Sequence, residues 1–188
     1  MWNILAVLTV VFLLEYLVPG MKELFMLDPM HPEQVWRIFT SIFLHGGLEH
    51  FFFNALSLFF FAPMLERTVG KDEFYKIFFI GGIIGSILYL GLCLAGISPM
   101  VPALGASGAI FAVMGAVAFF HPESIVYLYF FPVKLKYAVV LWVAINLFYI
   151  SPAGQASGIG GAAHLGGLFF GLIYAKWLFD KGIGWNYY

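Results

Sequence analysis

Long apolar runs, separated by short segments that contain polar residues, glycine or proline, dominate the pattern of this chain. A helix needs roughly 20 apolar residues to cross the hydrocarbon core of a membrane, and several runs approach that length. The pattern predicts six membrane-spanning helices, within residues 2–18, 48–65, 74–95, 105–121, 133–150 and 158–179. We therefore expect an all-α, polytopic membrane protein whose six helices form one bundle.

One polar stretch, residues 21–47, is too long to be a simple connector. It carries charged residues such as Lys22 and Arg37, and it also contains several aromatic and apolar side chains. Mixed segments of this kind suit the bilayer interface, where apolar side chains enter the lipid and charges stay in water. We expect a structured first loop that is partly embedded in the membrane. Glu15, just before it, lies either at the interface or within reach of Arg37.

The composition agrees with a membrane protein and excludes several other classes. Of the 188 residues, 62% are apolar and only 10% are charged, whereas soluble domains average about 25% charged residues. The composition also argues against binding to nucleic acid, which would need a basic patch, while the net charge of −1 is uninformative on its own. The single cysteine, Cys93, excludes an internal disulfide and a cysteine-based zinc site.

The start of the chain reads as a retained helix. The first apolar run lacks a basic beginning and a small-residue cleavage site, which a signal peptide would carry. We therefore expect residues 1–188 to form a single transmembrane domain with no separate soluble domain.

The basic residues indicate which side of the membrane each loop faces. Only Lys22 and Arg37 belong to the first loop. The other seven follow the second and fourth predicted helices or lie near the C-terminal end: Arg67, Lys71, Lys76, Lys134, Lys136, Lys176 and Lys181. Cytoplasmic loops carry the excess of basic residues. This distribution predicts a multi-pass protein of the plasma (inner) membrane with both termini in the cytoplasm and the first loop outside.

The fourth predicted helix is too short to cross the membrane. The 14 residues from Ser107 to Phe120 extend about 21 Å, against a hydrocarbon thickness of about 30 Å. If His121 marks the cytoplasmic interface, Ser107 lies roughly 10 Å below the outer surface. Residues 98–106 then enter the protein as irregular backbone, which is tolerated only where protein buries it or water reaches it. The pattern predicts a wet cavity floored by the start of this helix.

Other polar residues lie at a similar depth in neighbouring helices. His50 and Asn54 share one face of the second helix, and His164 lies about two turns into the sixth. Small residues repeat along the fourth and sixth helices, which lets two helix backbones approach closely. This approach would bring the short side chain of Ser107 to the imidazole of His164. The small residues are Gly108, Ala112, Gly115 and Ala116, and Gly160, Gly161, Ala163, Gly167 and Gly171.

A serine beside an imidazole provides a nucleophile and a general base. Serine attacks a carbonyl only when a neighbour accepts its proton, and an imidazole can accept that proton and return it to the leaving amine. The oxyanion needs hydrogen-bond donors, for which the Ser107 backbone N–H, the Asn54 amide and His50 are candidates. The sequence predicts a dyad without a third member, because Asp28, Asp72 and Asp180 lie in loops or at helix ends.

These residues resemble the motifs of the rhomboid family of intramembrane serine proteases. The motifs occur in order along essentially the whole chain, each on the expected element. They are Trp36-Arg37, His45, His50-x-x-x-Asn54, Glu66-Arg67 with Gly70, Gly105-Ala106-Ser107-Gly108 and Ala163-His164-Leu165-Gly166-Gly167. The resemblance implies the minimal six-helix form of the family, without an added cytoplasmic domain.

The resemblance also implies roles for individual residues. Ser107 is then the nucleophile and His164 the base, while His50 and Asn54, with the Ser107 amide, form the oxyanion hole. Gly105 belongs to the same oxyanion and substrate-binding region. The fifth helix and the loop over the site are implied to gate the lateral entry of a substrate helix. Phe111 departs from the pattern, since some members carry a tyrosine that packs under the histidine, and phenylalanine lacks the hydroxyl.

The sequence therefore predicts a serine endopeptidase that cleaves transmembrane segments of other membrane proteins near their outer ends. We expect no cofactor and no metal, because the five-residue spacing of His45 and His50 does not match a one-turn zinc motif. The expected partners are transmembrane protein substrates and the lipid bilayer. Two alternatives stay open: a small-solute transporter or channel, against which the missing internal repeat argues, and a non-catalytic rhomboid-like protein that binds membrane proteins.

Overall fold

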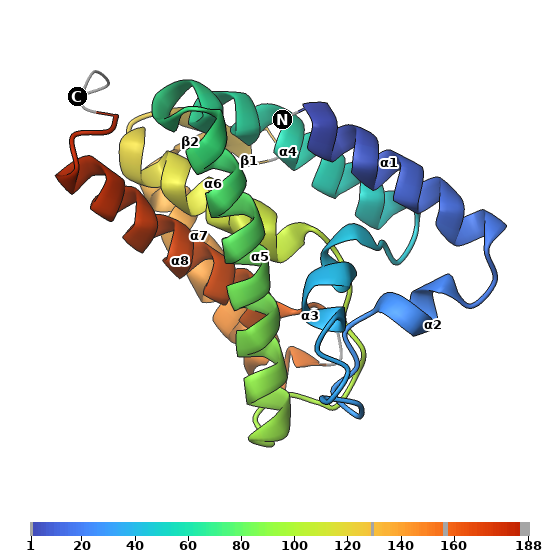
Figure 1. Ribbon diagram of the computed structural model, residues 1–188. Helices are drawn as coiled ribbons and strands as arrows, with labels where there is room; N and C mark the ends of the chain where they lie inside the picture. The colour runs from blue at the N-terminus through green and yellow to red at the C-terminus, as the bar shows by residue number, and fades with distance from the viewer. Residues whose placement is uncertain (1, 129, 156–157, 185–188) are drawn as a thin grey trace.

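The computed structural model describes residues 2–128, 130–155 and 158–184 and is mostly helical. Figure 1 shows the helices gathered in one bundle, with α6 in its interior between α5 and α8. The elements in chain order are α1 (Trp2–Leu17), α2 (Met21–Phe25), α3 (Arg37–Thr40), the 3₁₀ turn η1 (Ser41–Phe43), α4 (Leu48–Val69), α5 (Lys71–Leu94), α6 (Ser107–Phe120), β1 (Ile125–Leu128), β2 (Phe131–Lys134), α7 (Leu135–Ile150) and α8 (Gly161–Asp180).

Three of these helices are long and apolar enough to cross a membrane. They are α4, α5 and α8, with 22, 24 and 20 residues. The other apolar helices, α1, α6 and α7, have 16, 14 and 16 residues, below the roughly 20 that a perpendicular span needs. The chain therefore has apolar helices typical of an integral membrane protein. That all six of them cross the membrane stays a prediction. The start of α1, the hairpin and the end of α8 lie at one end of the bundle, away from the first loop (Figure 1).

Several helix ends differ from the predicted ones by a few residues. The second predicted helix continues beyond residue 65 to Val69, because Glu66 and Arg67 end the apolar run without ending the helix. The helix ends at Gly70, whose φ of 84° lies in the left-handed region that glycine adopts without a steric penalty. Gly70 also directly precedes α5, which begins at Lys71, three residues earlier than predicted.

The chain is not entirely helical, because a hairpin that the sequence analysis missed connects α6 to α7. Strands β1 and β2 pair in antiparallel register, with Ile125 opposite Lys134. Their β-branched and aromatic residues favour strands, but the apolar character of the segment made it resemble the start of a helix. The fifth predicted helix therefore begins at Leu135 rather than at residue 133. At the base of the hairpin, hydrogen bonds from Lys134 and Lys136 lower the pKa of the Glu123 carboxyl to about 2.

Helix α6 packs against α8 with backbone nearly touching backbone. Eleven of its 14 residues are buried. A Cβ added at Gly167 or Gly171 of α8 would meet the backbone of Gly108 or Ala112, and one added at Gly115 would meet the backbone of Leu168. The small-residue stripes thus bring the two helices together, as the sequence predicted.

The first loop is structured, as predicted, and it supports the segment before α6. Arg37 is 6% exposed and donates a hydrogen bond from Nη1 to the Met26 carbonyl at 2.8 Å. Leu27 and Ala103 exchange backbone hydrogen bonds of 2.9 and 2.8 Å, which join the loop to the irregular backbone of residues 98–106. The loop therefore holds the strand-like approach to α6 in place. Its embedding in the membrane stays a prediction.

We expect Gly171→Ala to destabilise the protein, because the added Cβ would collide with the backbone of Ala112. Overpacking of this kind typically costs about 1–3 kcal/mol. The matched control is Gly91→Ala in α5, where no neighbouring heavy atom of the described residues lies within 4 Å of the new Cβ. Thermal unfolding in detergent should give a lower midpoint for Gly171→Ala only. Equal midpoints for the two variants would contradict the close packing of α6 and α8.

Candidate active site

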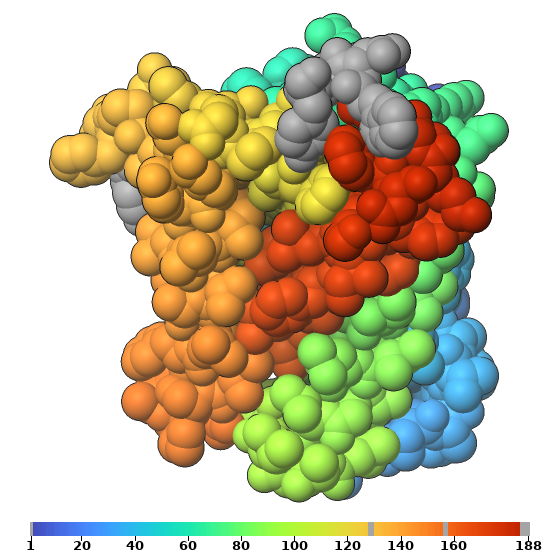
Figure 2. All heavy atoms as spheres, turned by 90° about the vertical axis from the view of Figure 1, so that its left-hand side faces the viewer, coloured from blue at the N-terminus to red at the C-terminus, as the bar shows by residue number. Residues whose placement is uncertain are grey.

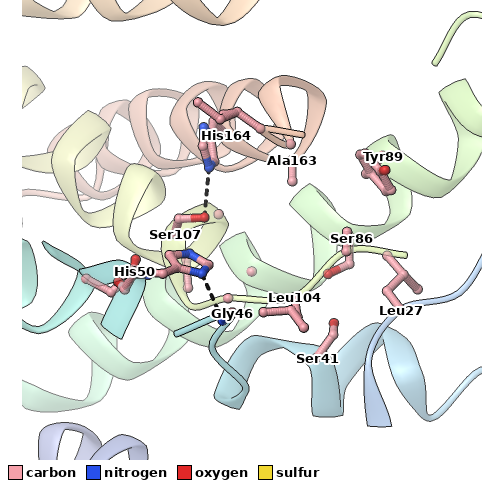
Figure 3. Close-up of a pocket in the computed structure, with 18 of the residues that line it drawn as sticks. Leu27, Ser41, Gly46, His50, Ser86, Tyr89, Leu104, Ser107, Ala163 and His164 are labelled. Carbon is pink, nitrogen blue, oxygen red and sulfur yellow. Dashed lines mark hydrogen bonds between the residues drawn. The ribbon is translucent and has the colours of Figure 1, made fainter. Parts of the chain in front are cut away.

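A cavity of about 550 Å³ lies beside the N-terminus of α6. It is bordered by residues of the first loop, α4, α5, α8 and the irregular segment before α6, as Figure 3 shows. All five residues that the sequence assigned to the site line it: His50, Asn54, Gly105, Ser107 and His164. The cavity predicted over the start of the short helix is therefore present. Within the described parts of the chain, no group of three or more His, Cys, Asp or Glu residues is arranged to hold a metal ion.

Ser107 and His164 meet across the contact between α6 and α8. The distance from Ser107 Oγ to His164 Nε2 is 2.7 Å, and Figure 3 shows the two side chains pointing toward each other. Ser107 is the first residue of α6, and His164 lies in the first turn of α8. The expected contact is thus formed by a serine from one helix and a histidine from the other, and both reach the cavity.

An aromatic ring supports the imidazole from one face. Phe111 stacks on His164 with ring centroids 4.5 Å apart and an interplanar angle of 12°. The edge of Trp142 lies 6.2 Å from Phe111 at 78°. Phenylalanine therefore supplies the ring stacking expected at this position, and the tyrosine hydroxyl of some family members has no counterpart here.

Asn146 completes the surroundings of the histidine, and the sequence analysis missed it. Its Oδ1 lies 2.7 Å from His164 Nδ1, on the opposite side of the ring from Ser107. The sequence predicted a pair without a third member because no aspartate lies within the predicted helices, whereas the structure places a neutral amide beside the histidine. The sequence did contain a signal for Asn146, because it is a polar residue within the apolar run 138–148 of α7. Polar residues inside membrane helices often mark functional sites.

His50 presents a hydrogen-bond donor toward the cavity. Its Nδ1 accepts a hydrogen bond from the backbone N–H of Gly46 at 3.2 Å, a contact drawn in Figure 3. Because a backbone N–H only donates, the proton of the neutral imidazole resides on Nε2. Asn54, which is 5% exposed, donates from Nδ2 to the His50 carbonyl at 2.9 Å. The second Nδ2 hydrogen of Asn54 is available to a ligand in the cavity.

Gly105 lines the cavity but does not offer it a backbone donor. Its N–H donates to the Ser41 carbonyl at 2.9 Å, so this amide is already paired, and a part for Gly105 in oxyanion or substrate binding stays a prediction. Its φ is 130°, and a Cβ at this position would lie 2.7 Å from Cε1 and 2.8 Å from Nε2 of His50. Glycine is required here because the His50 ring occupies the space of a side chain.

His45 is fully buried behind His50, with the two ring centroids 5.3 Å apart. Neither of its ring nitrogens has a hydrogen-bond partner among the described residues. Its backbone N–H donates to Glu15 at 2.9 Å, and Glu15 forms an ion pair with Lys22 at 3.2 Å. Glu15 therefore contacts the first loop through these two residues, while Arg37 bonds elsewhere.

The fold and the site together define a class of protein, the helical membrane bundles that hold a serine–histidine pair inside the bundle. The comparisons with known proteins identify the family within this class. The family model described as the Rhomboid domain matches residues 32–181, which is most of the chain. The chain belongs to the rhomboid family, as the resemblance of its motifs indicated.

Named relatives include proteases from several sources. Rhomboid protease GlpG of Haemophilus influenzae is 31% identical over 150 residues, covering 78% of this chain and 72% of the relative. RHOMBOID-like protein 12, mitochondrial, of Arabidopsis thaliana is 32% identical over 155 residues, covering 75% of this chain and 46% of the relative. The chain thus spans less than half the length of the plant protein. Inactive RHOMBOID-like protein 8 of Arabidopsis thaliana is 37% identical over 83 residues, covering 44% of this chain and 22% of the relative.

The stability of the protein should decrease in acid partly because of His45. Burial, with smaller contributions from His50 and Lys22, lowers its pKa from 6.5 to about 4. Between these values the unfolded chain binds the proton and the folded one does not, so stability falls as the pH drops from about 6.5 to 4, by up to about 3 kcal/mol. The variant His45→Gln cannot titrate. Unfolding midpoints at pH 7.5 and 5 should therefore differ less for His45→Gln than for the wild type, and equal differences would refute this origin.

Proposed function

We propose that this chain is an intramembrane serine protease that cleaves transmembrane segments of other membrane proteins. The proposal depends on one observation above all, the 2.7 Å hydrogen bond between Ser107 Oγ and His164 Nε2 inside a cavity of a rhomboid-family fold. A serine becomes a nucleophile when a base accepts its proton as it attacks. The named proteases among the relatives support the same reaction class.

The proposed reaction proceeds in two halves. The Ser107 oxygen attacks the substrate carbonyl while its proton moves to His164 Nε2, and His164 then gives the proton to the leaving amine as the peptide bond breaks. The product of this half is an ester between Ser107 and the new carboxyl end. In the second half, water gives a proton to His164 as it attacks the ester; the bond between the acyl carbon and Ser107 Oγ then breaks, His164 returns the proton to that oxygen, and the new carboxyl end is released.

Neutral donors around Ser107 would stabilise the oxyanion. The backbone N–H of Ser107 is in the first turn of α6, where amides lack partners within the helix and the helix dipole favours negative charge. His50 Nε2–H and the free Nδ2 hydrogen of Asn54 are the side-chain donors that line the same cavity. Gly105 contributes by leaving room for the His50 ring, so we assign it a positioning role.

The substrate segment must present an accessible peptide bond to this cavity. A helical peptide bond is shielded by its own hydrogen bonds, so a transmembrane substrate has to unwind near the cut. We therefore propose that small or helix-destabilising residues flank the cleavage site and that the cut lies near the outer end of the segment. The basic residues support an orientation with both termini in the cytoplasm of the plasma (inner) membrane.

The non-catalytic alternative has a specific observation in its favour, because one relative is named as inactive. The presence of both Ser107 and His164 in this chain argues for catalysis, whereas a protein that only binds membrane proteins does not need the pair. A fluorophosphonate, which reacts with activated serines, separates the two. Labelling that peptide mapping locates at Ser107 is expected. If the folded protein is not labelled, the protease proposal fails and a solute-flux assay becomes the next experiment.

Ser107→Ala should abolish cleavage of a transmembrane substrate, with a loss of at least about 1000-fold, because no other group can form the ester. His164→Ala should do the same and should also prevent fluorophosphonate labelling of Ser107. The matched control is Ser57→Ala on α4, a serine that does not line the cavity. Unfolding midpoints of all three variants should stay close to that of the wild type. Full activity of Ser107→Ala in purified protein would disprove the mechanism.

Asn54→Ala should slow turnover more than it weakens substrate binding. Removing one oxyanion donor typically lowers kcat by about 100-fold or more, because the donor acts on charge that exists only in the transition state. Steady-state cleavage in detergent gives kcat and KM separately. A raised KM with an unchanged kcat would instead assign Asn54 to ground-state binding of the substrate.

A further inference from the structure

The surroundings of His164 Nδ1 point to a role for Asn146 that the proposed mechanism leaves open. We infer that Asn146 is a positioning residue that fixes the tautomer and the orientation of the His164 imidazole, so that Nε2 faces Ser107 as a base. This inference rests on the proposed protease function for its consequence in catalysis. The geometry that carries it joins α7 to α8 and continues from His164 to Ser107 at the start of α6.

The amide of Asn146 has one consistent orientation. Its Nδ2 donates to the carbonyl of Trp142, one turn earlier in α7, at 2.8 Å. Turning the amide over would place Oδ1 against that carbonyl, and two acceptors repel each other. The Trp142 carbonyl therefore directs Oδ1 toward His164 Nδ1, where the distance is 2.7 Å.

This orientation determines where the imidazole carries its proton. Oδ1 can only accept, so the short contact requires a hydrogen on Nδ1. A neutral imidazole has one such hydrogen, and its lone pair is then on Nε2, 2.7 Å from Ser107 Oγ. The other tautomer would face Oδ1 with a lone pair and would be unable to accept the serine proton. Asn146 thus selects the tautomer that acts as a base.

Burial makes the contact strong and keeps it separate from the substrate. Asn146 is 2% exposed and is absent from the residues that line the cavity. A Cβ at Gly161 would lie 2.5 Å from the Asn146 carbonyl, so glycine at the start of α8 lets α7 approach closely at this level. Figure 2 shows α7 and α8 side by side along this face. The low exposure of Asn146 strengthens this hydrogen bond, because a hydrogen bond inside a protein is stronger than one in water.

A neutral amide also suits the membrane interior better than a carboxylate. A buried carboxylate would carry a charge that costs several kcal/mol to transfer from water unless it is paired. The amide provides the same acceptor geometry at Nδ1 without that charge. When His164 takes the serine proton, the Oδ1 dipole still stabilises the hydrogen on Nδ1.

The test compares two variants of Asn146 with a control on the same helix. Asn146→Leu keeps the approximate shape, excludes water and removes the acceptor, so kcat should fall about tenfold, the equivalent of one hydrogen bond, while KM stays the same. Asn146→Gln keeps both the amide oxygen and the amide donor on a neutral side chain and should retain more of the rate than Asn146→Leu. The control is Leu135→Ala, which truncates a buried side chain at the start of α7, at the opposite end of the helix from the part that holds Asn146. It should lower the unfolding midpoint and leave kcat unchanged.

Nitrogen NMR of the imidazole rings gives a second readout that needs no activity. With histidine labelled at its ring nitrogens, His164 in the wild type should show a protonated Nδ1 and an unprotonated Nε2, and this signature should be lost in Asn146→Leu. An unchanged kcat or an unchanged tautomer in Asn146→Leu would overturn the inference. A wild type that neither cleaves nor reacts with fluorophosphonate, yet shows the Nδ1-protonated ring, would overturn the proposed function alone.

Discussion

The contact between α6 and α8 is the constraint on which the rest of the structure depends. Side chains along this contact are so small that the backbone of one helix meets the backbone of the other, at Gly167 and Gly108 and again at Gly171 and Ala112. Apolar side chains gain little by leaving lipid for protein, so close van der Waals packing has to hold such helices together. The same approach brings a serine and a histidine within 2.7 Å. Packing and chemistry therefore share one contact.

The polar groups of the site are arranged so that none carries a required charge at rest. In the proposed mechanism a serine, two imidazoles and two amides would supply the nucleophile, the base, the donors and the positioning group, and each side chain is held by a backbone group or by another neutral side chain. Glu15 and Lys22 pair beside the first loop, while Glu123 pairs with Lys134 and Lys136 at the base of the hairpin, at the opposite end of the bundle. This separation avoids the desolvation cost of an ion inside the bundle. The catalytic charge would then appear only during the reaction, beside donors that are already in place.

The irregular segment before α6 is stable because other elements satisfy its backbone. Leu27 pairs with Ala103, and Ser41 accepts the hydrogen bond of Gly105. Both partners come from the first loop, which explains why a loop of this length is ordered. Without these bonds the backbone groups of Ala103 and Gly105 would lose their partners, and an unpaired backbone group buried away from water costs free energy comparable to a lost hydrogen bond. The first loop thus contributes to the site without supplying a reacting group.

Sequence alone determined the features that follow from periodicity and spacing. The apolar runs located the long helices, the 14-residue run predicted a helix start inside the protein, and the small-residue stripes predicted the meeting of Ser107 and His164. The roles of Ser107, His164, His50 and Asn54 in a reaction stay predictions. Only the tertiary structure decided that Asn146 reaches His164 from α7, that the Gly105 amide is used by Ser41, and that a hairpin precedes α7. The physical reason is that most of these contacts join residues that are well separated in the chain. A local sequence pattern does not specify which distant group will form a hydrogen bond with a given backbone or side-chain amide.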